Sequence, residues 1–280
     1  MHYAVRTMLL VALAGCVAWL APDPAFAQPA TRPTAPVAAK SQVERKTYDF
    51  KETGGAIKQM EYALFVPSGY DQAKKTPLVV ALHGLYSNPQ QIMHYPGMTN
   101  LAEKYGYIVV APMGYNNHGW YGAKPLVRGS ADDPKDLSDL SEQDVMNVLD
   151  LVRKAYSIDP DRIYLLGHSM GGGGAFELGI KHPELWAALA PIAPATNRPA
   201  TDAESIKRLP VILVQGDKDV LVRVERVRPW ADEMKKLGMD YEYDEIAGGN
   251  HISVAFESLP KIFAFFDKHK KGEIEKGAEK

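Results

Sequence analysis

Residues 167–175 read GHSMGGGGA, with one serine between two glycines and three further glycines behind them. The apolar run RIYLLG (162–167) predicts a buried strand before this stretch, and AFELGIKHPE (175–184) predicts a helix after it. Glycine inside a helix costs about 1 kcal/mol relative to alanine. We therefore expect the helix to pack closely against its neighbours or to line an opening. G-x-S-x-G between a strand and a helix is the pattern of a nucleophile elbow, which predicts Ser169 as a nucleophile.

Two other glycine-rich loops do not fit these residues. A phosphate-binding loop needs G-x-x-x-x-G-K-[ST], which the sequence lacks. A dinucleotide-binding G-x-G-x-x-G that starts at Gly171 needs a small residue at position 176, which is Phe176. A glycine-rich turn with an incidental serine is the remaining alternative to a nucleophile.

Short apolar runs alternate with helical patterns along the chain. Extended segments are predicted at 46–50, 60–67, 77–84, 107–112, 162–167, 187–193, 210–216 and 241–248. Ser141 and Asp144 fit a capping box at the start of a helix. Strands that alternate with helices predict an α/β fold, with a mainly parallel sheet of about eight strands and helices on both faces. Sites in such sheets form beyond the carboxyl ends of the strands.

A serine hydroxyl needs a base to take its proton and a third group to orient that base. After a nucleophile elbow the chain order is serine, acid, histidine. His251 follows the last predicted strand, and Asp219 stands in QGDKD at the end of the strand before it. We predict His251 as the base, with a capping or core histidine as the alternative. We predict Asp219 as the acid and Asp217 as a turn former.

Two backbone amides are predicted to stabilise a developing oxyanion. One is the amide of Met170, directly after the nucleophile, and the other is that of Leu85 in the loop after PLVVALHG (77–84). The alternative is that LHG forms only a turn.

Together these motifs resemble the α/β-hydrolase superfamily. LHGLYSNP, IVVAPMGY, DRIYLLGHSMGGGGAFELGIKHPELWAA, VQGDKDVLV and GGNH occur in that order within residues 60–266. The chain looks most similar to the esterase branch that contains feruloyl and acetyl-xylan esterases and polyhydroxyalkanoate depolymerases; the prolyl-oligopeptidase catalytic domain is a close relative. The resemblance implies hydrolysis through an acyl-enzyme with Ser169, Asp219 and His251 as the triad. It implies neither a metal nor an organic cofactor.

The N-terminal residues 1–27 have the composition of a secretory signal peptide. They contain an early cation, an apolar run too short for a membrane span, and an A-x-A site that predicts cleavage after Ala27. Export to the periplasm or the medium is therefore expected. Leu13-Ala14-Gly15-Cys16 leaves open a lipoprotein anchored to a membrane at Cys16, the only cysteine.

Three further segments complete the predicted organisation. Residues 28–46 are Pro/Ala-rich and predict a flexible linker. Residues 47–270 form the catalytic domain, and 271–280 form a charged tail. The net charge is −2 without a basic stripe, so we expect no nucleic-acid partner. The acidic stretch at 126–144 lacks the spacing of a calcium loop, so no metal site is expected.

The long insertion from 113 to 140 follows a strand end and is expected to overhang Ser169. Trp120 and Tyr121 are predicted to form an apolar wall for the substrate, with anchoring of the loop to the core as the alternative. Arg128 is interpreted as a surface cation. No insertion is long enough for a large lid domain.

The sequence thus predicts an exported serine carboxylic ester hydrolase that acts on small-molecule or polymer-linked esters. A peptidase of the prolyl-oligopeptidase type and an acyltransferase use the same triad and are the enzymatic alternatives. The alternative of another class is a non-catalytic exported binding protein. No oligomeric state is predicted.

Overall fold

The structure is a computed structural model that describes residues 42–52 and 54–272. The predicted signal peptide with Cys16, the linker up to residue 41 and residues 273–280 of the predicted tail lie outside the described residues.

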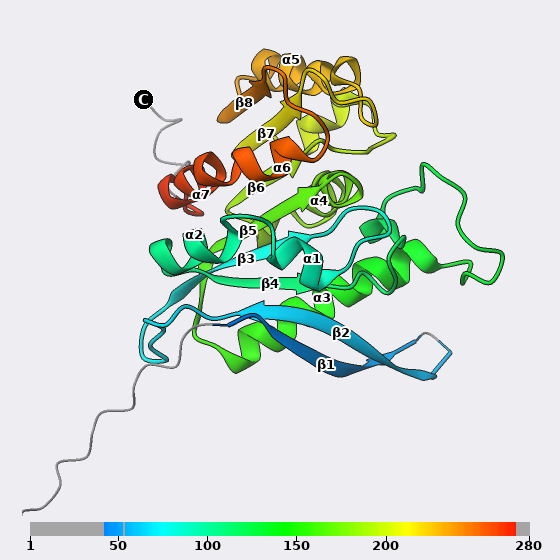
Figure 1. The fold of residues 1–280 in the computed structure, drawn as a ribbon, viewed down its shortest axis with the longest axis vertical. Helices are drawn as coiled ribbons and strands as arrows, with labels where there is room; N and C mark the ends of the chain where they lie inside the picture. The colour runs from blue at the N-terminus through cyan, green and yellow to red at the C-terminus, as the bar shows by residue number, and fades with distance from the viewer. Residues whose placement is uncertain (1–41, 53, 273–280) are drawn as a thin grey trace, which may run out of the picture. The chain divides into compact units, whose positions relative to one another are not determined.

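One eight-stranded sheet forms the centre of the domain, in the order β1-β2-β4-β3-β5-β6-β7-β8 (Figure 1). Its strands are β1 (Glu44–Lys51), β2 (Ile57–Phe65), β3 (Thr76–Leu82), β4 (Ile108–Pro112), β5 (Ile158–His168), β6 (Ala188–Ile192), β7 (Val211–Gly216) and β8 (Tyr241–Ile246). Each corresponds to a predicted segment. At one edge of the sheet, β1 pairs antiparallel with β2, and β2 pairs antiparallel with β4. The neighbouring strands β4, β3, β5, β6, β7 and β8 are all parallel to one another.

The first strand begins earlier than predicted. Glu44 already pairs with Leu64 of β2, so three residues of the predicted linker 28–46 belong to the sheet. The Pro/Ala-rich composition ends before this point, and the backbone ladder with β2 decides where the strand starts.

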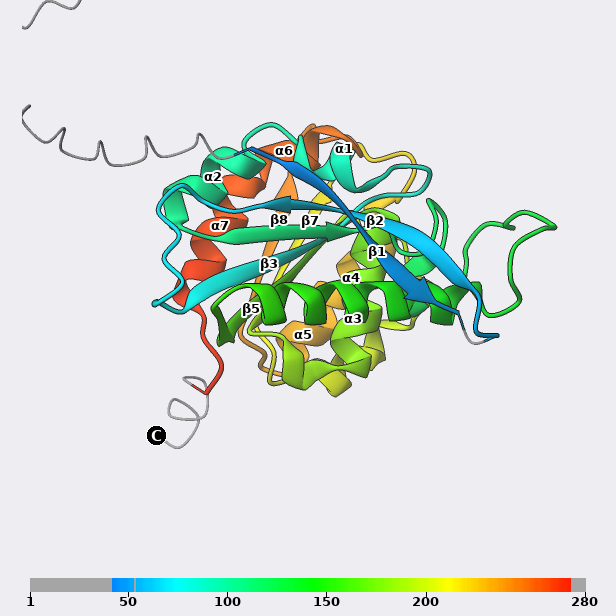
Figure 2. The same cartoon turned by 90° about the horizontal axis from the view of Figure 1, so that it is seen from below.

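Helices cover both faces of the sheet, as predicted (Figure 2). One face carries α1 (Pro89–Met93), α2 (Met98–Tyr105), α6 (Ser253–Glu257) and α7 (Leu259–Lys268); the other carries α3 (Leu137–Ala155), α4 (Met170–Lys181) and α5 (Arg228–Lys236). The remaining turns of helix are η1 (Trp120–Gly122), η2 (Pro183–Leu185), η3 (Ala200–Ile206) and η4 (Val224–Arg226).

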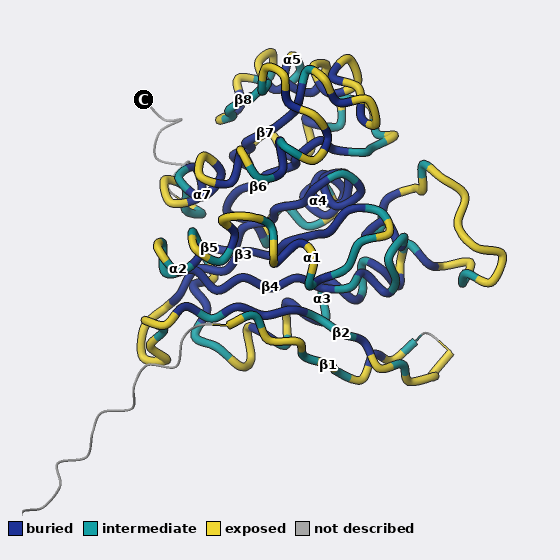
Figure 3. The backbone as a smooth tube through the Cα atoms, in the orientation of Figure 1, coloured by how far each residue is buried: buried dark blue, intermediate teal, exposed yellow. Residues whose placement is uncertain are grey.

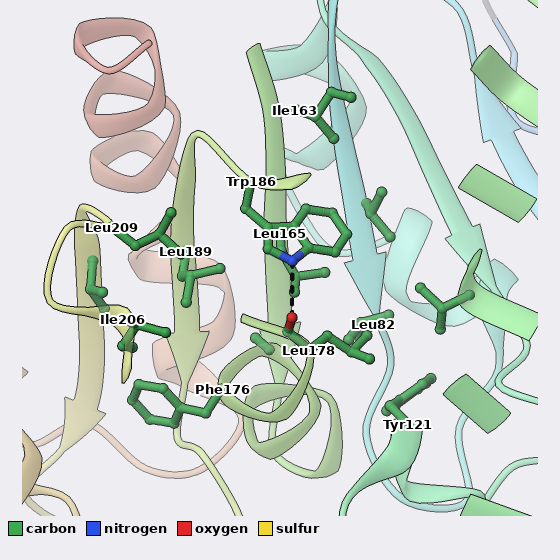
Figure 4. Close-up of a cluster of buried hydrophobic side chains, with 14 of the residues drawn as sticks. Leu82, Tyr121, Ile163, Leu165, Phe176, Leu178, Trp186, Leu189, Ile206 and Leu209 are labelled. Atoms are coloured by element: carbon green, nitrogen blue, oxygen red, sulfur yellow. Dashed lines mark hydrogen bonds between the residues drawn. The ribbon is translucent and has the colours of Figure 1, made fainter. Parts of the chain in front are cut away.

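The central strands are buried on both faces (Figure 3). Along β3, Leu78 and Val80 join the core under α3 and α4, whereas Val79 joins the core under the opposite helices. This alternation explains the unbroken apolar run, because each successive side chain enters a different core. In the core under α3 and α4, the Trp186 indole donates to the Leu178 carbonyl at 3.1 Å (Figure 4).

The predicted capping box is wrong. α3 begins at Leu137, so Ser141 and Asp144 lie inside the helix and are fully buried. Ser141 Oγ accepts the Tyr121 amide at 2.9 Å, and the Asp144 carboxylate accepts the Gly114 amide at 2.6 Å. Burial raises the pKa of Asp144 to about 6. These two side chains hold the start of the long loop to the helix instead of capping it.

The glycine run allows α4 to pack directly on backbone at three positions and on a tyrosine ring at the fourth, which confirms the expectation of close packing. A Cβ atom would lie under 3.0 Å from the Leu82 carbonyl at Gly171, from the Ile192 carbonyl at Gly172, from the Ala195 carbonyl at Gly173 and from the Tyr121 ring at Gly174. Such approaches are impossible for a residue with a side chain unless the backbone shifts.

Replacing Gly173 with Ala is therefore expected to lower the free energy of unfolding by about 1–3 kcal/mol, because the new methyl group clashes with the backbone at Ala195. Urea unfolding measures the change. Gly69→Ala is the matched control, since nothing lies within 4 Å of its Cβ position. Alanine also gains helix propensity over glycine. A stabilised Gly173→Ala variant would therefore show that the close approach is absent.

Candidate active site

Ser169 lies at the turn between β5 and α4 with φ 59° and ψ −114°. A non-glycine residue in such a conformation costs about 1–3 kcal/mol and is typical of functional turns. Backbone hydrogen bonds hold it: its amide donates to Ile192 at 2.9 Å, and its carbonyl accepts the amides of Gly173 at 3.0 Å and Ala195 at 2.9 Å. Ser169 is half-buried, whereas its chain neighbours are buried. This turn therefore presents the serine at the carboxyl end of the sheet.

Asp219 and His251 form a buried pair. His251 Nδ1 lies 2.7 Å from Asp219 Oδ2, and the Asp219 side chain is fully buried. The other carboxylate oxygen accepts the amides of Leu221 at 2.9 Å and Val222 at 2.8 Å. Gln215 Nε2 donates to Oδ2 at 3.2 Å. Because the carboxylate only accepts, it favours the His251 tautomer with a proton on Nδ1, which leaves Nε2 free to take a proton.

His168 joins this pair to the turn at Ser169. Its Nε2 lies 2.8 Å from the His251 carbonyl, and the two rings have centroids 4.8 Å apart. Its Nδ1 lies 2.8 Å from the Tyr95 hydroxyl. Within residues 42–52 and 54–272, the Ser169 hydroxyl makes no hydrogen bond to His251. The structure therefore brings His251 against His168, the residue before Ser169. The side chains of His251 and Ser169 are not directly hydrogen-bonded.

The two predicted oxyanion amides belong to the loop after β3 and to the start of α4. A Cβ atom on Gly84 would lie 3.4 Å from Ser169 Cβ, so the loop that carries Leu85 runs beside the serine. Met170 is the first residue of α4. In the described part of the chain, neither amide has a hydrogen-bond acceptor, whereas the Tyr86 amide donates to Asn117 at 2.7 Å. Both amides are thus available to an anion.

Trp120 lines a pocket of about 280 Å³, together with Tyr86, His118 and Arg128. The walls of this pocket come from the loop after β3, the long loop and the start of α3. The long loop spans residues 113–136 and extends away from the sheet (Figure 1). The contact between His118 Nε2 and Asp133 Oδ2, at 2.8 Å, closes this loop on itself.

Tyr121 differs from its predicted role in an apolar wall. Its side chain is fully buried, its ring fills the space left by Gly114 and Gly174, and its hydroxyl donates to the His83 carbonyl at 3.2 Å. The two glycines leave room for the ring beneath the loop, where substrate has no access. Tyr121 anchors the loop to the core, which is the alternative that the sequence left open.

A protein-family comparison matches residues 56–266 to the family Esterase, described as "Putative esterase". The chain belongs to this esterase family. The match runs from β2 into α7, and it includes every residue of the predicted site.

Relatives of this esterase chain carry esterase names. "Putative esterase NocK" of Nocardia uniformis subsp. tsuyamanensis is 28% identical over 227 residues, which cover 76% of this chain and 63% of the relative. The "Bifunctional acetylxylan esterase/xylanase XynS20E" of Neocallimastix patriciarum is 27% identical over 179 residues, 64% of this chain and 24% of the relative. The chain thus spans less than two thirds of either protein.

The structural comparison identifies the fold. A ferulic acid esterase from Anaeromyces mucronatus, AmCE1/Fae1A, in complex with ferulic acid, superposes with a TM-score of 0.63 at 19% identity, covering 84% of this chain and 93% of that one. The predicted α/β-hydrolase fold is confirmed, and no large lid interrupts it in the described residues.

The sequence did not predict three residues of the site: His168, Tyr95 and Gln215. His168 lies directly before Ser169 inside the G-x-S-x-G motif, and that position is a signal that could have found it. Tyr95 lies between α1 and α2, outside any motif, and nothing in the pattern around it indicates contact with the end of β5. Gln215 lies near the end of a buried strand, and a polar side chain at that place in VILVQG is a signal that could have found it. Asp217 accepts the Gly248 amide at 2.7 Å, in keeping with its interpretation as a turn former.

His168 gives a pH-dependent contribution to stability. Burial, followed by the charge of His251, lowers its pKa from 6.5 to about 4. Between pH 4 and pH 6.5, His168 is therefore protonated in the unfolded chain and neutral in the folded chain. The free energy of unfolding is therefore expected to fall by about 3 kcal/mol as the pH drops from 6.5 to 4.

Urea unfolding of the wild type and of His168→Gln at pH 7 and pH 4 measures this contribution. The difference between the two proteins isolates His168 from Asp144, whose raised pKa gives the opposite slope in the same range. If the wild type and His168→Gln lost the same free energy of unfolding between pH 7 and pH 4, the pH dependence would not come from His168.

Within the described residues, no group of three or more His, Cys, Asp or Glu side chains is arranged to hold a metal ion. None of the described helices has the length and apolar character needed to cross a membrane.

Proposed function

We propose that this chain is an exported serine esterase that hydrolyses carboxylic esters through an acyl-enzyme, with Ser169, His251 and Asp219 as its triad. The observation that carries the proposal is the buried His251–Asp219 pair, which is held at 2.7 Å beside the strained turn at Ser169. Nucleophile, orienting acid and base then follow one another in the chain order typical of this fold.

Each group has a defined role in the proposed reaction. His251 Nε2 takes the Ser169 hydroxyl proton as Oγ attacks the ester carbonyl carbon, while Asp219 stabilises the imidazolium. The Leu85 and Met170 amides donate to the oxyanion of the tetrahedral intermediate. The intermediate collapses, the proton passes from His251 to the departing alcohol, and the acyl group stays on Ser169. Water, deprotonated by His251, then attacks the acyl-enzyme. As the second tetrahedral intermediate collapses, His251 returns the proton to Ser169 Oγ and the acid is released.

Exposed apolar side chains support a substrate with an apolar group. Tyr86 follows Leu85 and is 65% exposed, Val220 and Leu221 follow Asp219 and are 82% and 69% exposed, and Ile252 follows His251 and is 53% exposed. Each of the four lies one or two positions after a residue of the proposed site, and apolar patches on a surface are typical of binding. The pocket lined by Tyr86 and Trp120 is the proposed place for the acyl or alcohol group, because Tyr86 directly follows Leu85.

A matched pair of substrates tests the proposed reaction class. p-Nitrophenyl acetate and p-nitroacetanilide carry the same acyl group on an ester and on an amide. Ester hydrolysis is expected to dominate, because the amide releases a poorer leaving group, and the names of the relatives favour esters. Faster turnover of the anilide would favour a peptidase. Acyl transfer to an added alcohol in preference to water would indicate an acyltransferase.

Export is proposed from residues 1–27 alone. Expression of the full chain in a bacterial host, followed by mass determination of the mature protein, tests it. The proposal expects a chain that starts at Gln28. A chain that keeps Met1, or one that starts with a lipid-modified Cys16, would contradict cleavage after Ala27.

A further inference from the structure

A partly buried chain of hydrogen bonds connects Tyr95, His168 and the backbone of His251. We propose that His168, oriented by Tyr95, is a positioning residue that fixes the backbone of His251 against the turn of Ser169. This inference rests on the proposed triad and adds two residues that act on the base through its main chain.

The direction of the hydrogen bonds follows from the acceptor at one end. The His251 carbonyl only accepts, so His168 Nε2, at 2.8 Å, carries a proton and donates it. A neutral imidazole then has a lone pair on Nδ1, which accepts the Tyr95 hydroxyl at 2.8 Å. Burial favours this neutral ring, since it lowers the pKa of His168 to about 4, and raises the pKa of Tyr95 to about 12. Both side chains keep these roles at neutral pH.

The base needs such a connection because it comes from a distant strand. β8 lies three strands from β5, which is about 14 Å at ordinary strand spacing. The loop at 247–252 therefore has to return across the sheet to reach Ser169. Asp219 holds the ring of His251 from the end of β7. Among the described residues, the bond from His168 is the one hydrogen bond that joins this loop to residues 167–171.

Tyr95 is itself fixed on two sides. Its ring meets that of His168 edge to face, with centroids 5.8 Å apart, and that of Phe256 in α6, with centroids 5.1 Å apart. α6 directly follows the loop that carries His251. Tyr95 therefore contacts both the turn of the nucleophile and the element after the base, and its hydroxyl orients the ring between them.

The test compares variants that keep or remove the donor to the His251 carbonyl. His168→Leu removes it, whereas His168→Gln keeps an amide N–H on a chain of similar reach. Tyr95→Phe removes only the hydroxyl that orients the ring. Tyr164→Phe is the matched control, because it removes a partly buried tyrosine hydroxyl outside the site, one that donates to the His269 carbonyl at 2.7 Å.

We expect His168→Leu to lower kcat for p-nitrophenyl acetate by about 10- to 100-fold with little change in KM, because a displaced base lowers the rate of the chemical step. Labelling by a fluorophosphonate probe slows by a similar factor. His168→Gln recovers a large part of both rates. Tyr95→Phe lowers kcat by about 2- to 10-fold, and Tyr164→Phe leaves it unchanged.

A side chain that only fills space would give another pattern. Wild-type kcat and labelling rate in folded His168→Leu, or equal losses in the Gln and Leu variants, would overturn the inference. If His168→Leu does not fold, an unchanged kcat in Tyr95→Phe overturns it instead. The proposed triad is tested separately by the wild type: absence of labelling there refutes the triad, whereas normal labelling with unaffected variants refutes only the positioning role.

Discussion

Replacing Ser169 with Ala is expected to lower kcat for ester hydrolysis by at least about 10⁴-fold. The reason is that no other group can form the acyl-enzyme, so the remaining rate comes only from substrate binding and the oxyanion donors. The fold is expected to survive, because Ser169 holds its neighbours through its backbone, whose bonds to Ile192, Gly173 and Ala195 are retained. Steady-state kinetics and thermal unfolding measure the two quantities.

Ser205→Ala is the matched control for this experiment. Ser205 is exposed in η3, so its loss is expected to leave both rate and stability unchanged. A Ser169→Ala protein that keeps its fold and still hydrolyses ester within about tenfold of the wild-type rate would contradict the role of Ser169 as nucleophile.

Replacing Asp219 with Asn is expected to lower kcat by about 10⁴-fold. The carboxylate accepts His251 Nδ1–H at 2.7 Å, and an amide group that faces this nitrogen would favour the tautomer in which Nε2 carries the proton. Such an imidazole cannot act as the base for Ser169. Asn keeps an oxygen for the amides of Leu221 and Val222, so the turn should remain intact. Kinetics over a range of pH, with KM determined separately, measure the effect.

Asp217→Asn provides the matched control two residues away. Asp217 binds the Gly248 amide and does not contact His251, so kcat is expected to stay within about threefold of wild type. If Asp217→Asn lost more activity than Asp219→Asn, the acid would be assigned to the wrong carboxylate.

The sequence predicted the fold because local and global signals agree. The apolar runs of β3 to β7 coincide with strands buried on both faces, and turn residues separate them from amphipathic helices. The glycine run was interpretable for the same reason, since four glycines in a helix are costly unless backbone lies close on several sides. Motif order paired Asp219 with His251 without coordinates, and the structure places these two side chains 2.7 Å apart.

Contacts between distant segments could not be predicted in the same way. Ser141 and Asp144 fit a capping box by spacing, but they bind the backbone of residues 114–121, which lie far before them in the chain. The sequence placed Tyr121 near substrate because it lies in the long loop. Its ring is instead buried in the space left by Gly114 of that loop and Gly174 of α4. Tyr95 reaches His168 across 73 positions of the sequence. Each outcome depends on tertiary packing, which leaves no periodic signal.

The most direct test of the central claim is to locate the residue that reacts with a fluorophosphonate probe. The purified protein is labelled, digested and studied by mass spectrometry. We predict one equivalent of probe on Ser169, prevented by prior incubation with an ester-like inhibitor and absent from Ser169→Ala. Labelling at another residue, or ester hydrolysis by a protein whose Ser169 stays unmodified under saturating probe, would contradict the assignment of Ser169 as the nucleophile.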